Sequence, residues 1–109
     1  MENQYILVLT TVLSREEADK LAAALVESRL VACVNISSSV TSVYHWKGDV
    51  CKDEEFMLFM KTEKALYREV EEEIKQLHPY ELPEIIAIPI ESGSKEYLSW
   101  ISENTLESQ

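Results

Sequence analysis

Glycine, proline and cysteine are all scarce in this sequence, which has 2, 3 and 2 of them among 109 residues. So few chain-breaking residues, together with 46% hydrophobic residues, exclude a disordered or collagen-like chain and are typical of one globular domain, here residues 1–109. The two cysteines form neither a C-x-x-C motif nor a disulfide framework, so we expect reduced thiols. Cys33 lies in an apolar strand pattern and should be buried and inert, whereas Cys51 should be exposed.

Basic side chains are also few. The sequence has 10 lysines and arginines against 20 aspartates and glutamates, a net charge of -10. Such a field repels phosphate backbones, and the basic residues are scattered singly, so nucleic acid is not an expected partner, whereas small cations are. The first residues, "MENQYILVLTT", have an acidic start and an apolar run that is too short for a signal peptide or a membrane span. We expect a cytoplasmic protein with no membrane partner.

The apolar pattern alternates between strand and helix periods. It predicts strands at residues 5–12, at 30–36 continuing with a kink through 40–46, at 54–61 and at 84–92. It predicts helices at residues 14–30, from Thr62 to His78, and in "SKEYLSWISEN" at residues 94–104. The order is βαββαβ with a terminal helix, which favours an α+β, ferredoxin-like split βαβ sandwich.

Local signals fix several of these elements. Ser14 and Glu17 form a capping box at the start of the first helix, and Thr62 can cap the second. The first and third strands are apolar on both faces and should be central, whereas Pro89 places the last strand at an edge. One apolar stripe of the second helix should pack on the sheet; it consists of Leu66, Val70, Ile74 and Leu77.

The segment "HPYELPE", residues 78–84, is the densest group of chemically active side chains. Its two prolines make it stiff, so one interpretation is a rigid connection between a helix and an edge strand. The other is a site in which His78, Tyr80 and Glu84 converge on a divalent cation or a small polar ligand. An imidazole with a carboxylate suits Cu(II) or Zn(II), but two ligands do not close a site, so water or another subunit must supply the rest.

A second candidate is "YHW", which sets Tyr44 and Trp46 on one face of a hairpin arm. Such aromatic residues serve packing, a subunit interface or the stacking of a ligand. No nucleophile with its base, phosphate loop or H-E-x-x-H motif is present. We therefore do not expect an enzyme. An enzyme that uses His78 and Glu84 as base and acid is an alternative, but only the types of these two residues support it.

Taken together, "LVACVNI", "TSVYHWKGDV", "DEEFMLFMKT", "LHPYELPEIIAIPI" and "YLSWI" resemble the CutA (CutA1) divalent-cation tolerance family over residues 5–102. The resemblance implies a ferredoxin-like fold similar to that of PII signalling proteins. It also implies a tight homotrimer, in which long hairpins pair with neighbouring sheets and divalent cations bind in clefts between subunits. The implied function is tolerance of copper and other divalent metals.

Carried onto this chain, the family's proposed metal ligands match His78 and Glu84. A third ligand in a bacterial member is a cysteine, where this chain has Thr10, so we expect weak binding of Cu(II) or another divalent cation and no organic cofactor. Four further residues are candidates for the lining of the cleft: Tyr44, Trp46, Lys61 and Tyr80. The alternative function is a PII-like regulatory module that binds a small metabolite or a protein partner in the same cleft.

Overall fold

The computed structural model describes residues 4–106. Its elements, in chain order, are β1 (Tyr5–Val12), α1 (Arg15–Glu27), β2 (Cys33–Ile36), β3 (Val40–Trp46), β4 (Asp49–Glu63), the 3-10 helix η1 (Lys64–Leu66), α2 (Tyr67–Leu77), β5 (Ile86–Ile90) and α3 (Lys95–Glu103). None of the helices in this described part is long and apolar enough to cross a membrane.

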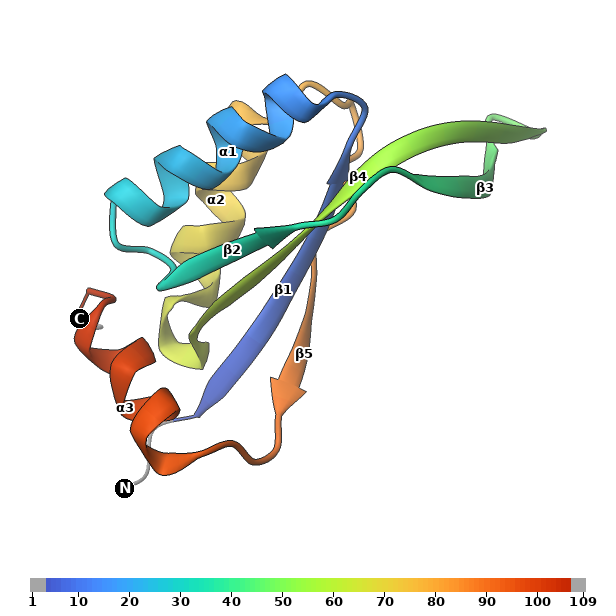
Figure 1. The fold of residues 1–109 in the computed structure, drawn as a ribbon. Coiled ribbons are helices and arrows are strands. Elements are labelled where there is room, and N and C mark those ends of the chain that lie inside the picture. Colours follow the sequence, from blue (N-terminus) through green and yellow to red (C-terminus); the bar gives the residue numbers. More distant parts are fainter. Residues whose placement is uncertain (1–3, 107–109) are drawn as a thin grey trace.

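All strands belong to one antiparallel sheet, in the order β2-β4-β1-β5, with β3 paired to the first part of β4. The long strand β4 therefore belongs to two structures, because it pairs with β3 at its start and with β1 at its end. Figure 1 shows the result: α1 and α2 cover one face of the sheet, and the hairpin of β3 and β4 projects beyond both layers as an arm. The molecule measures 46 × 25 × 24 Å.

The core lies between the sheet and the two helices α1 and α2. Alternate residues of β1, beginning with Ile6 and Val8, point to this side, as do their register partners in β4, which include Met60. They pack on Leu21 and Leu25 of α1 and on α2. This burial of apolar area is the main stabilising term of the fold.

The predicted positions of the strands are largely confirmed. β1 lies between β4 and β5 and is central, and β5, which contains Pro89, lies at the edge of the sheet. The predicted long second strand is instead two strands, separated at Ser37 to Ser39, and the first begins only at Cys33. The delay has a local cause, since the N–H groups of Leu30 and Val31 still bond to the Leu25 carbonyl at the end of α1.

Four expectations about single side chains are wrong. Thr62 caps no helix, because it pairs with Ile6 inside β4 and its hydroxyl donates to the Leu30 carbonyl at 2.7 Å. Leu77 is 49% exposed, and the buried position at that end of α2 is taken by His78. Cys33 is only partly buried and contacts the Tyr97 hydroxyl at 3.7 Å. Cys51, expected to be exposed, is also partly buried.

The capping signals of α1 have a clear structural basis. The Ser14 hydroxyl accepts from the Glu17 N–H at 3.1 Å, as the capping box predicts. At the other end Arg29 has a φ of 63°, a left-handed conformation that usually favours glycine. The N–H groups of Arg29 and Leu30 close the end of the helix on Val26 and Leu25, and the Arg29 guanidinium donates to the Glu103 carbonyl at 2.9 Å.

The tip of the arm is a two-residue turn. Lys47 and Gly48 connect β3 to β4 with φ angles of 50° and 87°. Positive φ at both central residues suits the right-handed twist of the flanking strands. Glycine adopts this conformation at no steric cost. For lysine the conformation has a steric cost, so the backbone at Lys47 is strained.

Candidate functional site

His78 is held by hydrogen bonds at both ring nitrogens. It is 8% exposed. Its Nδ1 accepts from the Tyr80 N–H at 3.2 Å, so in the neutral ring Nε2 carries the proton and donates to the Thr11 carbonyl at 2.7 Å. Pro79 makes this possible, because it ends α2 at His78 in an extended conformation, with ψ of 134°. The ring therefore ties the end of α2 to the end of β1.

Tyr80 connects His78 to a buried carboxylate. The two rings contact each other edge to face, with centroids 4.5 Å apart, and the Tyr80 hydroxyl donates to Glu55 Oε2 at 2.6 Å. Glu55 belongs to β4 and is 7% exposed. Burial, and then the hydrogen bond to Glu55, raise the pKa of Tyr80 well above its ordinary value. Tyr80 is thus a neutral donor that satisfies a buried carboxylate.

A groove of about 630 Å³ lies between the arm and the segment at residues 80–86. It brings together three of the four candidate cleft residues, Tyr44, Trp46 and Tyr80, with the candidate ligand Glu84. The remaining lining residues are Leu13, His45, Asp53, Glu81, Leu82, Pro83, Ile85 and Ile86. Glu84 is exposed here, and Trp46 is half-buried.

The groove wall contributed by the arm repeats the pairing of a phenol with a carboxylate. The Tyr44 hydroxyl donates to Asp53, and this bond, with smaller contributions from burial and nearby charge, raises the pKa of Tyr44 to about 12. An ion pair at 3.7 Å between Lys47 and Glu81 joins the tip of the arm to the opposite wall. Both of its side chains are largely exposed, so it contributes little to stability.

Lys61, the fourth candidate for the cleft, does not line this groove. Its ammonium donates to Asn35 Oδ1 at 2.8 Å and lies 5.6 Å from the centre of the Tyr97 ring. In β1, Leu7 lies between Ile6 and Val8, which face the helices, so Leu7 points to the opposite sheet face. Lys61 pairs in register with Leu7 and therefore lies on that opposite face as well. The sequence interpretation thus grouped residues of two separate surfaces.

The donors of one chain do not close a metal site. Among residues 4–106 no group of three or more histidine, cysteine, aspartate or glutamate side chains is placed to hold an ion. Thr10, compared above with a cysteine ligand proposed in a bacterial member, has a hydroxyl that is fully buried and has no hydrogen-bond partner among the described residues. His78 fits metal binding in part, because a ligating histidine usually donates its other N–H to a carbonyl or a carboxylate, as Nε2 does here. Its Nδ1 lone pair, however, is occupied by the Tyr80 N–H.

Sequence reasoning missed Asp53 and Glu55. Both lie on β4 two residues apart, and therefore point to the same side of the hairpin. The one feature of the sequence that could have indicated them is the presence of carboxylates within a segment whose other residues favour a β-strand. Their partners Tyr44 and Tyr80 lie 9 and 25 positions away in sequence, so periodicity alone cannot pair them.

The architecture defines an α+β protein with an antiparallel sheet, helices on one face and a groove at the base of a hairpin arm. A family model described as CutA1 divalent ion tolerance protein matches residues 6–104. The divalent-cation tolerance protein CutA of Thermus thermophilus is 51% identical over 98 residues, which are 90% of this chain and 95% of that protein. The crystal structure of CutA1 from Oryza sativa has a TM-score of 0.94 at 40% identity and 96% coverage of both chains.

This chain belongs to the CutA1 divalent ion tolerance family, as its motifs indicated. The family is named for tolerance of divalent ions and not for a reaction. The chloroplastic protein CutA of Arabidopsis thaliana is 43% identical over 100 residues, and the match covers 92% of this chain but only 55% of that protein. The chain thus spans about half the length of that plant relative.

Proposed function

We propose that this protein is a homotrimer that binds Cu(II) or another divalent cation weakly, in clefts between subunits, and so contributes to metal tolerance in the cytoplasm. The observation that carries the proposal is the orientation of His78, whose Nε2 proton is fixed on the Thr11 carbonyl. Only Nδ1 can then offer a lone pair to a cation. The proposed second donor, Glu84, is exposed in the groove, and Tyr80, which lines the same groove, packs on the His78 ring. A cation bound there would act as a Lewis acid, but the proposed function is binding of the cation and includes no reaction.

Two features account for weak binding. A cation at Nδ1 must displace the Tyr80 N–H, whose bond of 3.2 Å is the longer of the two at His78. Thr10 offers a buried neutral hydroxyl in place of a thiolate, so the soft ligand that favours Cu(I) is missing. Water or a second copy must then complete the coordination shell, which is why the proposal requires assembly.

The sheet face opposite α1 and α2 supports assembly. Alternation along β1 and its register with β4 and β5 place one set of large apolar side chains on this face. They are Leu7, Leu9, Met57, Phe59, Ile86 and Ile88. Ile86 and Ile88 are 48% and 46% exposed in the single chain, and an exposed apolar face of this kind marks a surface for protein contacts. Three copies, with a ferredoxin-like and PII-like arrangement, are what the family resemblance implies.

Equilibrium dialysis of Cu(II) and Zn(II) tests the metal site. The protein is used with Cys33→Ser and Cys51→Ser, so that thiols neither reduce nor capture copper. We expect Glu84→Gln and His78→Gln each to weaken Cu(II) binding at least about tenfold, and Glu81→Gln, an exposed carboxylate of the same groove, to leave it unchanged. Equal affinity in the Glu84 and Glu81 variants, or no binding by the parent protein, would refute the site.

Sedimentation equilibrium tests the assembly. We expect three times the mass of one chain for the parent protein, and dissociation on Ile88→Asp, because a charge on the buried face of an interface is left unpaired. Val26→Asp is the matched control, since Val26 is a partly exposed apolar residue of α1 on the helix side. A monomeric parent protein contradicts the proposal. So does an Ile88→Asp variant that assembles as well as the Val26→Asp variant.

A further inference from the structure

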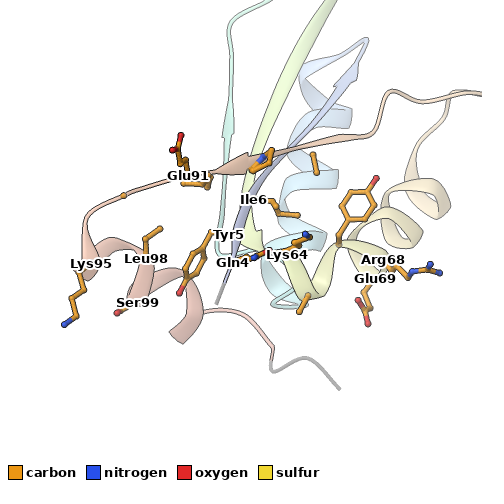
Figure 2. A pocket seen from close by; sticks show the side chains of 16 residues that line it. Gln4, Tyr5, Ile6, Lys64, Arg68, Glu69, Glu91, Lys95, Leu98 and Ser99 are labelled. Carbon is orange, nitrogen blue, oxygen red and sulfur yellow. The ribbon is translucent and has the colours of Figure 1, made fainter. Parts of the chain in front are cut away.

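A second cavity, larger than the groove, lies at the opposite end of the molecule from the arm. It has a volume of about 1300 Å³ and is formed by the start of β1, the end of β5, the starts of α2 and α3, and η1. Figure 2 shows Lys95 at one end of it and Arg68 at the other, with Lys64 between them. Neither the metal site nor the apolar sheet face uses these residues.

None of the three cations at this cavity makes a side-chain hydrogen bond or an ion pair in the described part of the chain, although Arg68 lies near enough to Glu71 to interact with its charge. All ten lysines and arginines of the sequence lie within residues 4–106, and six of them have a hydrogen bond or an ion pair from their side chains. Among the described residues, four cations have neither, and three of those four line this one cavity: Lys64, Arg68 and Lys95. The fourth, Lys52, lies on the arm. The chain as a whole has a net charge of -10, so a cluster of positive side chains without ion pairs is unusual in it.

The cavity also offers apolar surface. Ile6, Pro89 and Leu98 contribute to its lining, together with Ala87, Ile90 and the ring of Tyr67. Two carboxylates, Glu69 and Glu91, line it as well, so the lining carries one net positive charge from three cations and two anions. Figure 2 places Glu69 beside Arg68 on α2 and Glu91 at the end of β5, while Lys64 is central. Lys64 is therefore the cation that a ligand in the middle of the cavity meets first.

We propose that this cavity binds a small organic anion, whose phosphate or carboxylate group is neutralised by Lys64 and whose apolar part lies on Ile6, Pro89 and Leu98. Arg68 and Lys95, at the two ends, add attraction at longer range and can contact a second charged group. Ile6 belongs to the core packed under α1 and α2, so the cavity opens on the helix side of the sheet. Binding here is thus compatible with assembly through the opposite face.

Isothermal titration calorimetry with 1-naphthyl phosphate, in the presence of a chelator that removes metal ions, tests the proposal. This probe combines a flat apolar ring with a dianion, and 1-naphthoate, inorganic phosphate and 1-naphthol separate the contributions of phosphate, charge and ring. We expect binding of the aromatic anions, weaker binding of inorganic phosphate and of 1-naphthol, and loss of affinity with rising salt. Backbone amide signals of Lys64, Tyr67 and Gly93 should shift on titration, because all three residues line the cavity.

Substitutions of the unpaired cations locate the site. Lys64→Gln should weaken binding of 1-naphthyl phosphate at least about tenfold, whereas Lys64→Arg should retain most of it. Lys52→Gln removes the same charge from the arm and is the matched control, with unchanged affinity. All of these positions are exposed, so equal melting temperatures are expected. The absence of binding at millimolar probe, or an equal loss in the Lys64→Gln and Lys52→Gln variants, would overturn the proposal without affecting the metal site.

Discussion

The hydrogen bond between Tyr80 and Glu55 should be among the most important single contacts of the groove. Tyr80→Phe removes only the phenolic oxygen and keeps the ring that packs on His78. The variant leaves a carboxylate that is 7% exposed without the donor that lies 2.6 Å from it in the parent protein. An unpaired buried charge is costly, because neither water nor protein compensates for its lost hydration.

The size of the effect follows from the burial of the acceptor. Hydrogen bonds to charged groups contribute about 1.5 to 3 kcal/mol, and a buried group that loses its partner falls at the upper end. Tyr80 itself is half-buried, so water reaches part of the site and lowers the cost. We expect Tyr80→Phe to lower the free energy of unfolding by about 2 kcal/mol, or the melting temperature by roughly 10 °C for a domain of this size.

Urea unfolding followed by circular dichroism, at a fixed protein concentration, measures this cost. Tyr44→Phe is the matched control, because it breaks the same kind of pair, with Asp53, on the exposed wall of the same groove, and it should change stability little. In a Glu55→Gln background the cost of Tyr80→Phe should shrink, since a neutral amide is left unpaired instead of a charge. Equal costs for Tyr80→Phe and Tyr44→Phe would show that burial of Glu55 does not strengthen the bond.

Three further predictions concern pH, the turn and the core. Burial and the bond to Glu55 raise the pKa of Tyr80, so the folded state holds this proton more tightly, and the stability that this gives is complete below about pH 10 and declines as pH rises toward the folded pKa. The bond to Asp53 raises the pKa of Tyr44 to about 12, but this side chain is exposed, so its proton contributes little to stability. Absorbance titration of tyrosinate should show Tyr44→Phe removing a transition near pH 12, and a native protein whose tyrosines all titrate near 10 contradicts this. Lys47→Asn should raise the free energy of unfolding by about 0.5 to 1 kcal/mol, because asparagine tolerates positive φ better than lysine and the exposed ion pair that it removes is weak; a less stable variant in urea would be the contrary result. Thr10→Val should stabilise the protein by about 1 kcal/mol, since it removes a buried hydroxyl that has no partner, and a lower melting temperature would show that the hydroxyl is satisfied.

Sequence reasoning succeeded where the cause is local. The capping box at Ser14, the end of α2 at His78 and the edge position of the strand with Pro89 each depend on a few neighbouring residues. It failed where a distant partner competes for the same group. Thr62 has the chemistry of a helix cap, but pairing with β1 and a bond to the Leu30 carbonyl keep it in β4.

The candidate site shows the same division. The motif "HPYELPE" drew attention to His78, Tyr80 and Glu84, and Tyr80 and Glu84 do line one groove, with Tyr44 and Trp46 on its other wall. Lys61 was a candidate for the same cleft, yet in the single chain it lies near the end of β4, beside Asn35 and Tyr97, and not on the arm. Glu55 was not singled out, because nothing in the strand pattern tells a buried carboxylate from a solvated one.

The sequence by itself determined the order of the elements, which strands are central, and membership of the CutA1 family, since these depend on apolar period, turn chemistry and motifs that are contiguous in the chain. Only the tertiary structure decided which ring nitrogen of His78 carries the proton, which carboxylates the tyrosines satisfy, and that three unpaired cations meet at one cavity. Those facts depend on burial and on contacts between segments far apart in sequence. A hydrogen bond or a charge becomes strong or costly only once folding has removed the water around it.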